Sequence, residues 1–543
     1  MLSRPLLYFR TLRYLKPIQI YGRLLFRLRR PNADLRPAPA LRQVSGGWIP
    51  CARQSSMLGS ATFRFLSVTR DATAAADWNR ADWPKLWLYN LHYFDDLNAV
   101  EAVTRVEWHR ALVERWVAEN PPAAGNGWEP YPLSLRLVNW VKWAAAGNAP
   151  EAGMVQSLAV QSRWLMGRLE RHLLGNHLLA NAKALVFSGC FFSGPEADTW
   201  RQTGLAILRR EHAEQILNDG GHFERSPMYH AIILEDLLDL IQLALHWPGT
   251  VEVETVAAWR RQAAPMLAWL AAMSHPDGEL AFFNDAALGI APNLAGLWAE
   301  ALALGIEVPM PAVAPLVMLP ESGYVRVEKG EAVLLADVGE IGPDYLPGHA
   351  HADTLSFELS VFGRRVVVNS GTSEYGLGAE RLRQRGTAAH STVQIDGADS
   401  SEVWSGFRVA RRARPVGFAA SEDRDAVEVT CAHDGYGRLQ GRPLHRRSWR
   451  MTTQGLRVVD TIEGGFGAAV ARFHLHPAVT VSGAGDGGLL TLPDRHTMRW
   501  SVTGGSARIV AATWHPEFGQ SIAGTCIELV FAGPQATIEF FWD

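Results

Sequence analysis

The hydrophobic pattern of this chain changes once, near residue 310, and that change constrains the fold more than any other feature. From about residue 85 to 305, apolar residues recur near every 3.6 positions, as in "SLRLVNWVKWAAAG". This spacing predicts amphipathic helices. After the Pro-rich stretch "VPMPAVAPLVMLP" (308–320), the segments become short and β-branched, and Gly, Asp or Pro bounds them. No helical segments alternate with them, so we expect antiparallel strands.

The length of the chain indicates more than one domain, because 543 residues exceed what one hydrophobic core usually holds. We predict a multidomain α + β chain with a basic lead-in segment over 1–84, a helical domain over 85–312 and an antiparallel β-sandwich over 320–543. A cleft between two such domains is a common place for a ligand site.

The formal net charge of −3 argues against a general nucleic-acid binder. No stretch reaches the roughly 20 apolar residues of a membrane span. The apolar core and cleavage site of a signal peptide are also missing, which favours a cytoplasmic chain and leaves export by another route open. The first 33 residues carry eight Arg and Lys and no acidic residue. We expect a basic amphipathic first helix that docks on its own domain, on a membrane surface or on an acidic partner.

Two polar clusters interrupt the helical half. "LLGNHLLANAKAL" contains Asn176 and His177, and on their own these are more simply explained as a helix cap and a satisfied core histidine. "DGGHFERSPMYHAIILEDLLDL" places Tyr229 three residues after Ser226, and the Ser-Pro pair looks like a helix start. Tyr229 is therefore expected in a first turn, at the rim of the helical domain.

A third cluster, "LPGHAHADTLSFEL", precedes an alternating apolar run and holds His349, His351 and Asp353 at every second position. In an extended chain these three side chains would share one face. His390, in "RGTAAHSTVQIDG", starts another predicted strand and would join them if the two strands are neighbours. Two histidines alone are a weak metal motif, and histidines exposed on a sheet remain the plainer interpretation.

Five motifs taken in order, "GNH", "ERSPMYH", "GHAHADTLSFEL", "NSGTSEYG" and "RGTAAHSTVQIDG", resemble the heparinase II/III family of polysaccharide lyases. The resemblance covers roughly residues 85 to 420. It implies an incomplete (α/α) toroid followed by an antiparallel β-sandwich. It also implies an enzyme that cleaves an anionic, uronic-acid-containing polysaccharide, glycosaminoglycan-like or alginate-like, by β-elimination.

The same resemblance implies roles for four residues. Asn176 and His177 would contact the uronate carboxylate. Tyr229 would act as the acid, and as the base too where both reacting groups lie on one face of the sugar. His349 would be a second base or would help to ionise the tyrosine. These roles match what elimination needs, namely a neutralised carboxylate, a base and an acid.

Family members carry a metal bound by two histidines and an aspartate, and the matching positions are His351, His390 and Asn369. Asn369 departs from the pattern, because an amide is a poorer zinc ligand than a carboxylate. The resemblance thus implies a divalent metal, Zn²⁺ first and Mn²⁺ as the alternative, with a structural role.

Four further residues are predicted to bind substrate because they lie beside the motif clusters: Arg136, Glu224, Arg225 and Arg383. Arginine forks match carboxylate and sulfate groups. Arg225 could also supply the positive charge that an ionised Tyr229 requires.

Two other functions compete with the lyase. One is a non-catalytic glycan-binding or exopolysaccharide-assembly protein that keeps the lyase fold, and the missing signal peptide motivates it. The other is a glycoside hydrolase, which would need two carboxylates about 5 to 10 Å apart in the cleft. Glu224 and Asp285 are available for that role, although neither lies in a paired motif.

Overall fold

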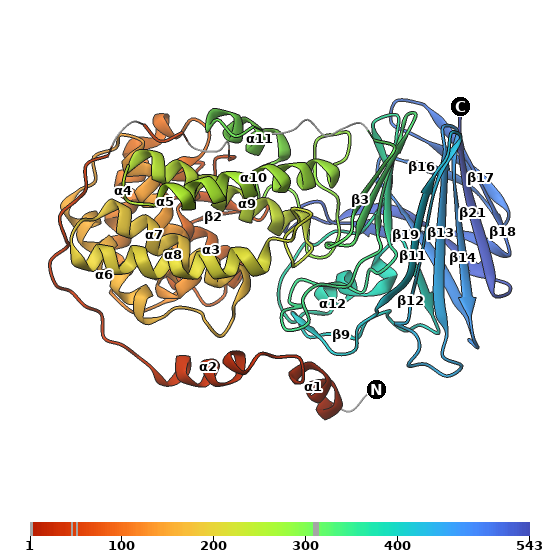
Figure 1. Ribbon diagram of the computed structural model, residues 1–543, viewed down its shortest axis with the longest axis horizontal. Coiled ribbons are helices and arrows are strands. Elements are labelled where there is room, and N and C mark those ends of the chain that lie inside the picture. Colours follow the sequence, from red (N-terminus) through yellow and green to blue (C-terminus); the bar gives the residue numbers. More distant parts are fainter. Residues whose placement is uncertain (1–3, 45–46, 50–52, 308–313) are drawn as a thin grey trace.

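The computed structural model describes residues 4–44, 47–49, 53–307 and 314–543, and Figure 1 shows a helical half beside a β half. The predicted domain boundary at 312 falls within 308–313 and lies outside the described residues. Among the described residues, no helix is both long and apolar enough to cross a lipid bilayer.

The helical half buries its apolar faces in one core that includes Trp116, Trp140 and Leu185, all with no exposed surface. This burial accounts for the 3.6-residue pattern, since each helix presents an apolar stripe to its neighbours. The helices are α3 (Lys85–Tyr93), α4 (Val106–Glu119), α5 (Pro130–Ala145), α6 (Ala152–Gly167), α7 (Gly175–Phe191), α8 (Pro195–Gln215), α9 (Pro227–His246), α10 (Val253–Ala272) and α11 (Leu294–Ala303). Short 3-10 turns join them, η1 (Ala75–Asn79), η2 (Asp95–Asn98), η3 (Ala102–Arg105) and η4 (Asn126–Trp128).

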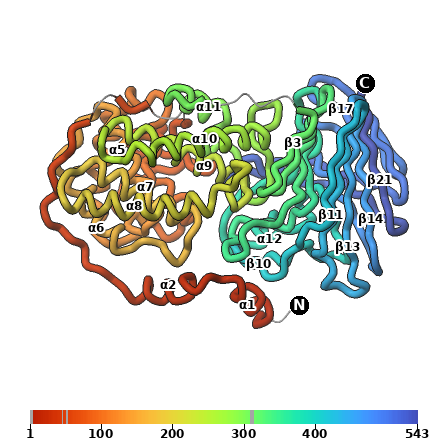
Figure 2. The backbone as a smooth tube through the Cα atoms, in the orientation of Figure 1, coloured from red at the N-terminus to blue at the C-terminus, as the bar shows by residue number. Residues whose placement is uncertain are grey.

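The basic amino-terminal segment forms two helices, α1 (Arg4–Leu12) and α2 (Pro17–Leu28). Pro17 is the first residue of α2, where its missing N–H costs nothing. The two helices lie along one edge of the molecule, α2 beside the helical half and α1 beside the β half (Figures 1 and 2). A small hairpin, β1 (Thr62–Phe65) with β2 (Val68–Asp71), follows before α3.

The β half consists of two packed antiparallel sheets. One has the order β11-β12-β13-β14-β21-β18-β17-β16, and the other β19-β20-β15-β7-β6-β5-β4-β3 with β8 paired to β15. The strands of the second sheet are β3 (Leu316–Leu319), β4 (Tyr324–Lys329), β5 (Ala332–Asp337), β6 (Phe357–Val361), β7 (Arg364–Val368), β8 (Val393–Ile395), β15 (Ala469–Leu475), β19 (Gly505–Trp514) and β20 (Ile522–Phe531). Those of the first are β11 (Pro415–Glu422), β12 (Ala426–His433), β13 (Leu444–Thr452), β14 (Gly455–Glu463), β16 (Thr480–Ala484), β17 (Gly487–Thr491), β18 (Thr497–Thr503) and β21 (Gln535–Trp542).

Strand β5 explains how the two halves join. All six of its residues are buried, and its side chains alternate between two cores. Leu334 packs between the sheets, whereas Leu335 packs against Trp269 of α10. The second sheet is therefore covered on one face by the first sheet and on the other by helices. The helical half followed by an antiparallel sandwich confirms the predicted fold class.

Two loops meet at this junction and carry the candidate site. The loop between α10 and α11 is tied to β6 by His275, whose Nε2 lies 2.8 Å from Glu358 Oε2. The backbone N–H of Asn284, in the same loop, donates to Asp353 Oδ2 at 2.9 Å. These bonds hold residues 284 and 285 against the segment just before β6. A short hairpin, β9 (Val403–Trp404) with β10 (Arg408–Val409), and helix α12 (Ala379–Arg385) with the turn η5 (Thr387–Ala389) complete the surroundings.

Candidate active site

Tyr229 lies in the first turn of α9, as the Ser-Pro pair predicts. The Ser226 hydroxyl accepts a hydrogen bond from the Tyr229 backbone N–H at 3.2 Å, which caps the helix. The Tyr229 ring packs on the His349 ring with centroids 3.9 Å apart. Its hydroxyl lies 3.0 Å from the hydroxyl of Tyr375. A tyrosine of the helical half and a histidine of the β half therefore lie in contact where the two halves meet.

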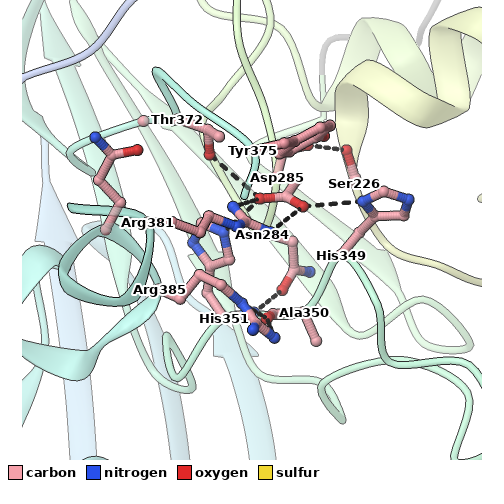
Figure 3. Close-up of polar contacts among 12 residues, drawn as sticks. Ser226, Asn284, Asp285, His349, Ala350, His351, Thr372, Tyr375, Arg381 and Arg385 are labelled. Carbon is pink, nitrogen blue, oxygen red and sulfur yellow. Dashed lines mark hydrogen bonds and ion pairs between the residues drawn. The ribbon is translucent and has the colours of Figure 1, made fainter. Parts of the chain in front are cut away.

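Asp285 contacts several polar side chains around this tyrosine-histidine pair, as Figure 3 shows. Its carboxylate lies 2.9 Å from His349 Nδ1 and 2.8 Å from His351 Nε2. The Arg381 guanidinium donates to both carboxylate oxygens, with Nη2 2.7 Å from Oδ2. Burial alone would raise the pKa of Asp285, but Arg381 and the two histidines hold that pKa well below its ordinary value. Asp285 is therefore a buried anion that fixes both imidazoles.

The segment around His349 and His351 differs from its prediction. It is a loop rather than an extended strand, and β6 begins only at Phe357. The loop curves around Asp285, so that one nitrogen of each imidazole contacts the same carboxylate. Asp353 accepts a hydrogen bond from the Asn284 backbone N–H. The alternation of histidines therefore predicted their proximity but not the shape of the backbone.

The free nitrogen of His349 faces Glu224. His349 Nε2 lies 3.6 Å from Glu224 Oε2, while Nδ1 is held by Asp285. Glu224 is only 3% exposed, and burial raises its pKa, partly offset by His349 and by a bond from the Asn176 backbone N–H. Glu224 thereby connects the tyrosine-histidine pair to the first turn of α7.

The start of α7 completes the cluster. Gly175 has a φ of +55°, and an added Cβ would lie 2.4 Å from Leu346, so only glycine fits there. His177 packs on Tyr131 at 4.5 Å between centroids, and its Nδ1 lies 3.2 Å from Glu170 Oε1. Burial lowers the pKa of His177, but Glu170 outweighs it and raises the pKa overall. Glu170 therefore makes His177 easier to protonate than a free histidine.

The tyrosine hydroxyl is held in its neutral form. Burial, followed by the neighbouring Tyr375, raises the pKa of Tyr229 well above 10. The pKa of Tyr375 is raised in the same way, chiefly by burial. A proton on Tyr229 is thus retained at neutral pH, which suits a proton donor better than a base.

The three predicted metal ligands lie near each other but do not form a complete donor set. His351 Nδ1 is 3.2 Å from His390 Nε2, yet the Asn369 amide is already used. Its oxygen accepts from the Ser391 N–H at 3.0 Å, and its nitrogen lies 3.3 Å from Ser356 Oγ. The described part of the chain holds no group of three or more His, Cys, Asp or Glu side chains able to bind a metal. Two imidazoles without an anionic third ligand fit a zinc ion poorly.

Three of the predicted substrate-binding arginines lie elsewhere. Arg136 is fully buried, and its guanidinium donates to Gln161 Oε1 and to backbone carbonyls. Arg225 points to the backbone carbonyls of Glu321 and Glu340, which ties the helical half to the β half. Arg383 pairs with Glu380 and contacts His515 at the surface. Arg136 is thus enclosed in the helical core, where it has no surface to offer a substrate. Arg225 is partly exposed, and its role in substrate binding stays a prediction, as does that of Arg383.

Sequence reasoning missed three residues of the site. The sequence predicts Asp285 only as a hydrolase carboxylate, and it predicts a substrate role for Arg383 but none for Arg381, two positions earlier on α12. Tyr375 stands in the quoted motif "NSGTSEYG" but received no role. The sequence offered one signal, because Arg381 and Arg385 are four positions apart and would share one face of a helix. In the structure both are fully buried.

Family models match most of the chain. The model described as "Heparinase II/III N-terminus" matches residues 111–299, and "Heparinase II/III-like, C-terminal" matches residues 311–542. Among solved structures, "Crystal Structure of Heparinase III" has a TM-score of 0.68 at 16% identity, over 88% of this chain and 79% of that one. A heparan sulfate lyase from Pedobacter heparinus has a TM-score of 0.60 at 17% identity, over 97% of this chain and 88% of that one. These structures share the fold.

Curated relatives are of two kinds. The "FtsZ-localized protein C" of Caulobacter vibrioides is 28% identical over 76% of this chain and 73% of its own length. A "Heparin-sulfate lyase" of Bacteroides stercoris is 26% identical over 42% of this chain and 37% of its own length. The chain thus aligns with little more than a third of that lyase, whereas the alignment with the localised protein covers most of both chains.

Proposed function

Since the chain belongs to the heparinase II/III family of polysaccharide lyases, we propose that it cleaves a glycosaminoglycan-like polysaccharide by β-elimination at a uronic acid. The observation that carries this proposal is the stacking of Tyr229 on His349, at 3.9 Å between centroids, in a cluster shared by both halves. Elimination removes the C5 proton, breaks the C4–O bond and leaves a C4–C5 double bond conjugated with the carboxylate.

The start of α7 would hold the uronate carboxylate. Glu170 raises the pKa of His177, and a protonated His177 would offer positive charge to an anion. The Asn176 amide can donate without titrating. Together they would stabilise the negative charge that develops when the C5 proton leaves.

His349 would take the C5 proton. With Nδ1 fixed 2.9 Å from the Asp285 carboxylate, a neutral His349 carries its proton on Nδ1. The Nε2 lone pair, 3.6 Å from Glu224 Oε2, is then the one that would accept the C5 proton. A carboxylate that orients a base in this manner also stabilises the imidazolium that forms. Asp285 is thus a positioning residue for His349.

Tyr229 would protonate the departing glycosidic oxygen. Its raised pKa keeps the proton on the hydroxyl until the transition state. Tyr375, 3.0 Å away, accepts or donates a hydrogen bond that orients that hydroxyl. No step passes through a metal, because His351, His390 and Asn369 lack a complete donor set.

The same geometry disfavours hydrolysis. Glu224 and Asp285 lie on opposite sides of the His349 ring, next to Nε2 and Nδ1 respectively. Asp285 is also locked by Arg381 and has no exposed surface. Neither position suits a pair of carboxylates that flanks a glycosidic bond.

The test is ultraviolet absorbance during incubation with heparan sulfate, chondroitin, hyaluronan, alginate and glucuronan, because only elimination forms the conjugated double bond. We expect a rise on one uronate polymer and a loss of about a hundredfold or more in Tyr229→Phe. Tyr436→Phe is the matched control, since Tyr436 is also buried and its hydroxyl donates to the Val393 carbonyl inside the sandwich. A rise that survives in Tyr229→Phe would overturn the assigned acid.

A second candidate is a non-catalytic glycan-binding or assembly protein. The alignment with the FtsZ-localized protein over most of both chains favours it. Binding of a polymer without any absorbance rise, by protein that is shown to be folded, would decide for this candidate and against the lyase.

A further inference from the structure

The two amino-terminal helices expose apolar side chains on their outer faces. On α2, Ile20, Leu24 and Leu28 follow one another at four-residue spacing and are 58%, 61% and 70% exposed. On α1, Phe9 is 68% exposed and Leu12 lies one turn further along the same face. Residues that lie on one helical face and are so exposed form a continuous apolar stripe, which is unusual for a helix that packs on a soluble domain.

The inner faces of the same helices are already occupied. Gly22 of α2 lies directly against His172, where an added Cβ would come within 3.0 Å. Arg168 donates to the Phe26 carbonyl at 2.6 Å. One face of α2 therefore packs on the helical half. The apolar stripe lies on the other face of a helix that is already docked.

Helix α1 is attached in the same way to the β half. The Trp404 indole donates to Thr11 Oγ1 at 3.1 Å, and the Tyr8 ring meets the Trp404 ring at 4.9 Å. Both helices thus lie along one edge of the molecule (Figures 1 and 2). Their outer stripes face away from the two domains that hold them.

Basic residues flank the apolar stripe. The first 33 residues carry eight cations and no anion, in a chain whose net charge is −3. Arg23 and Arg27 of α2 are exposed beside the stripe, and Arg30, two residues past the end of the helix, is exposed as well. An apolar stripe bordered by arginines is typical of a helix that lies in the interface of a bilayer and pairs with anionic headgroups.

We propose that the outer face of α1 and α2 binds an anionic lipid bilayer surface and holds the molecule there as a peripheral protein. The charge distribution distinguishes this partner from a second copy of the chain, since pairing two such faces would bring the exposed Arg23, Arg27 and Arg30 of both copies together. It also distinguishes a bilayer from a purely acidic protein, which would leave Phe9, Leu24 and Leu28 in water. This inference is independent of the proposed lyase activity.

The experiment is co-sedimentation of the full chain with vesicles of phosphatidylcholine alone and of an equal mixture with phosphatidylglycerol. We expect binding to the anionic vesicles only, weakening as salt screens the headgroups. Phe9→Ser/Leu24→Ser/Leu28→Ser should weaken binding by about a hundredfold or more. Arg27→Gln/Arg30→Gln should weaken it by about fivefold for each arginine.

The matched control is Val103→Ser/Val253→Ser, two valines that are 81% and 77% exposed on other elements, and it should bind as the wild type does. Circular dichroism and the unfolding temperature establish that each variant is folded. Wild-type protein that stays in the supernatant, or a serine triple variant that binds normally, would overturn the proposal. So would a dimer in light scattering that the triple variant abolishes, because the stripe would then belong to a second copy.

Discussion

Asp285→Asn is the substitution that tests the organisation of the site most directly. The asparagine keeps the shape but removes the carboxylate whose two oxygens accept hydrogen bonds from the Arg381 guanidinium, and Arg381 has no exposed surface. Leaving one member of a buried ion pair without its partner costs about 3–5 kcal/mol. With an unfolding entropy of about 2.1 cal/mol/K per residue over 543 residues, the unfolding temperature should fall by about 3–4 °C.

The same change should also impair catalysis separately from stability. An amide that turns its NH₂ toward His349 Nδ1 forces the proton onto Nε2, so that the imidazole can no longer accept the C5 proton. We expect the elimination rate to fall by about a hundredfold or more, measured by ultraviolet absorbance at a temperature where the variant is folded.

The control is the double variant Asp285→Asn/Arg381→Met. Removing both charges should restore most of the lost unfolding temperature, because no buried charge then remains unpaired. The elimination rate should remain low, since His349 has still lost its acceptor. An unchanged unfolding temperature in Asp285→Asn, or a double variant less stable than the single one, would refute the reasoning.

The difference in unfolding temperature between the wild type and Asp285→Asn should depend on pH in a direction that the pKa of Asp285 sets. The pKa of Asp285 is lowered in the folded state, so its stabilisation is present above its ordinary value of 3.8 and is lost as the pH falls through the folded value. The gap in unfolding temperature between the wild type and Asp285→Asn should therefore narrow only in strong acid.

Three further outcomes follow from other residues. Burial raises the pKa of Glu224, so the folded protein loses stability as the pH rises above 4.5, the ordinary pKa of a glutamate. Glu224→Gln should therefore unfold at a higher temperature than the wild type at neutral pH. Calorimetry should show that this gain vanishes toward pH 4. Arg136→Met should destabilise the helical half by about 3 kcal/mol in urea titrations without changing KM, because its buried hydrogen bonds serve the fold. Tyr375→Phe removes one hydrogen bond to Tyr229 and should lower kcat up to about tenfold with KM unchanged; a change in KM alone would contradict its positioning role.

The helical half and the order of the two architectures could be predicted because periodicity is a local property. The start of α9 was equally accessible, since a serine before a proline satisfies the first-turn N–H groups wherever it occurs. The proximity of Tyr229 and His349 came from the family motifs, because no local rule joins residues that are 120 positions apart.

The arginines show the limit of such reasoning. Arg381 and Arg383 have the same chemistry and stand two positions apart, yet one is fully buried on Asp285 and the other pairs with Glu380 at the surface. On a short helix, a two-residue step turns a side chain to the far face. Which face is inward depends on where α12 packs, and that is decided by residues far away in the chain.

The sequence by itself determined the two architectures, the helix starts and the basic, apolar character of the first 30 residues, because each of these depends on neighbours along the chain. Only the tertiary structure decided that Asp285 joins His349, His351 and Arg381, that Arg136 serves the fold, and that the stripe of α1 and α2 faces outward. Side-chain partners and exposed faces arise from the packing of distant segments, where burial and charge pairing set the free energy of each contact.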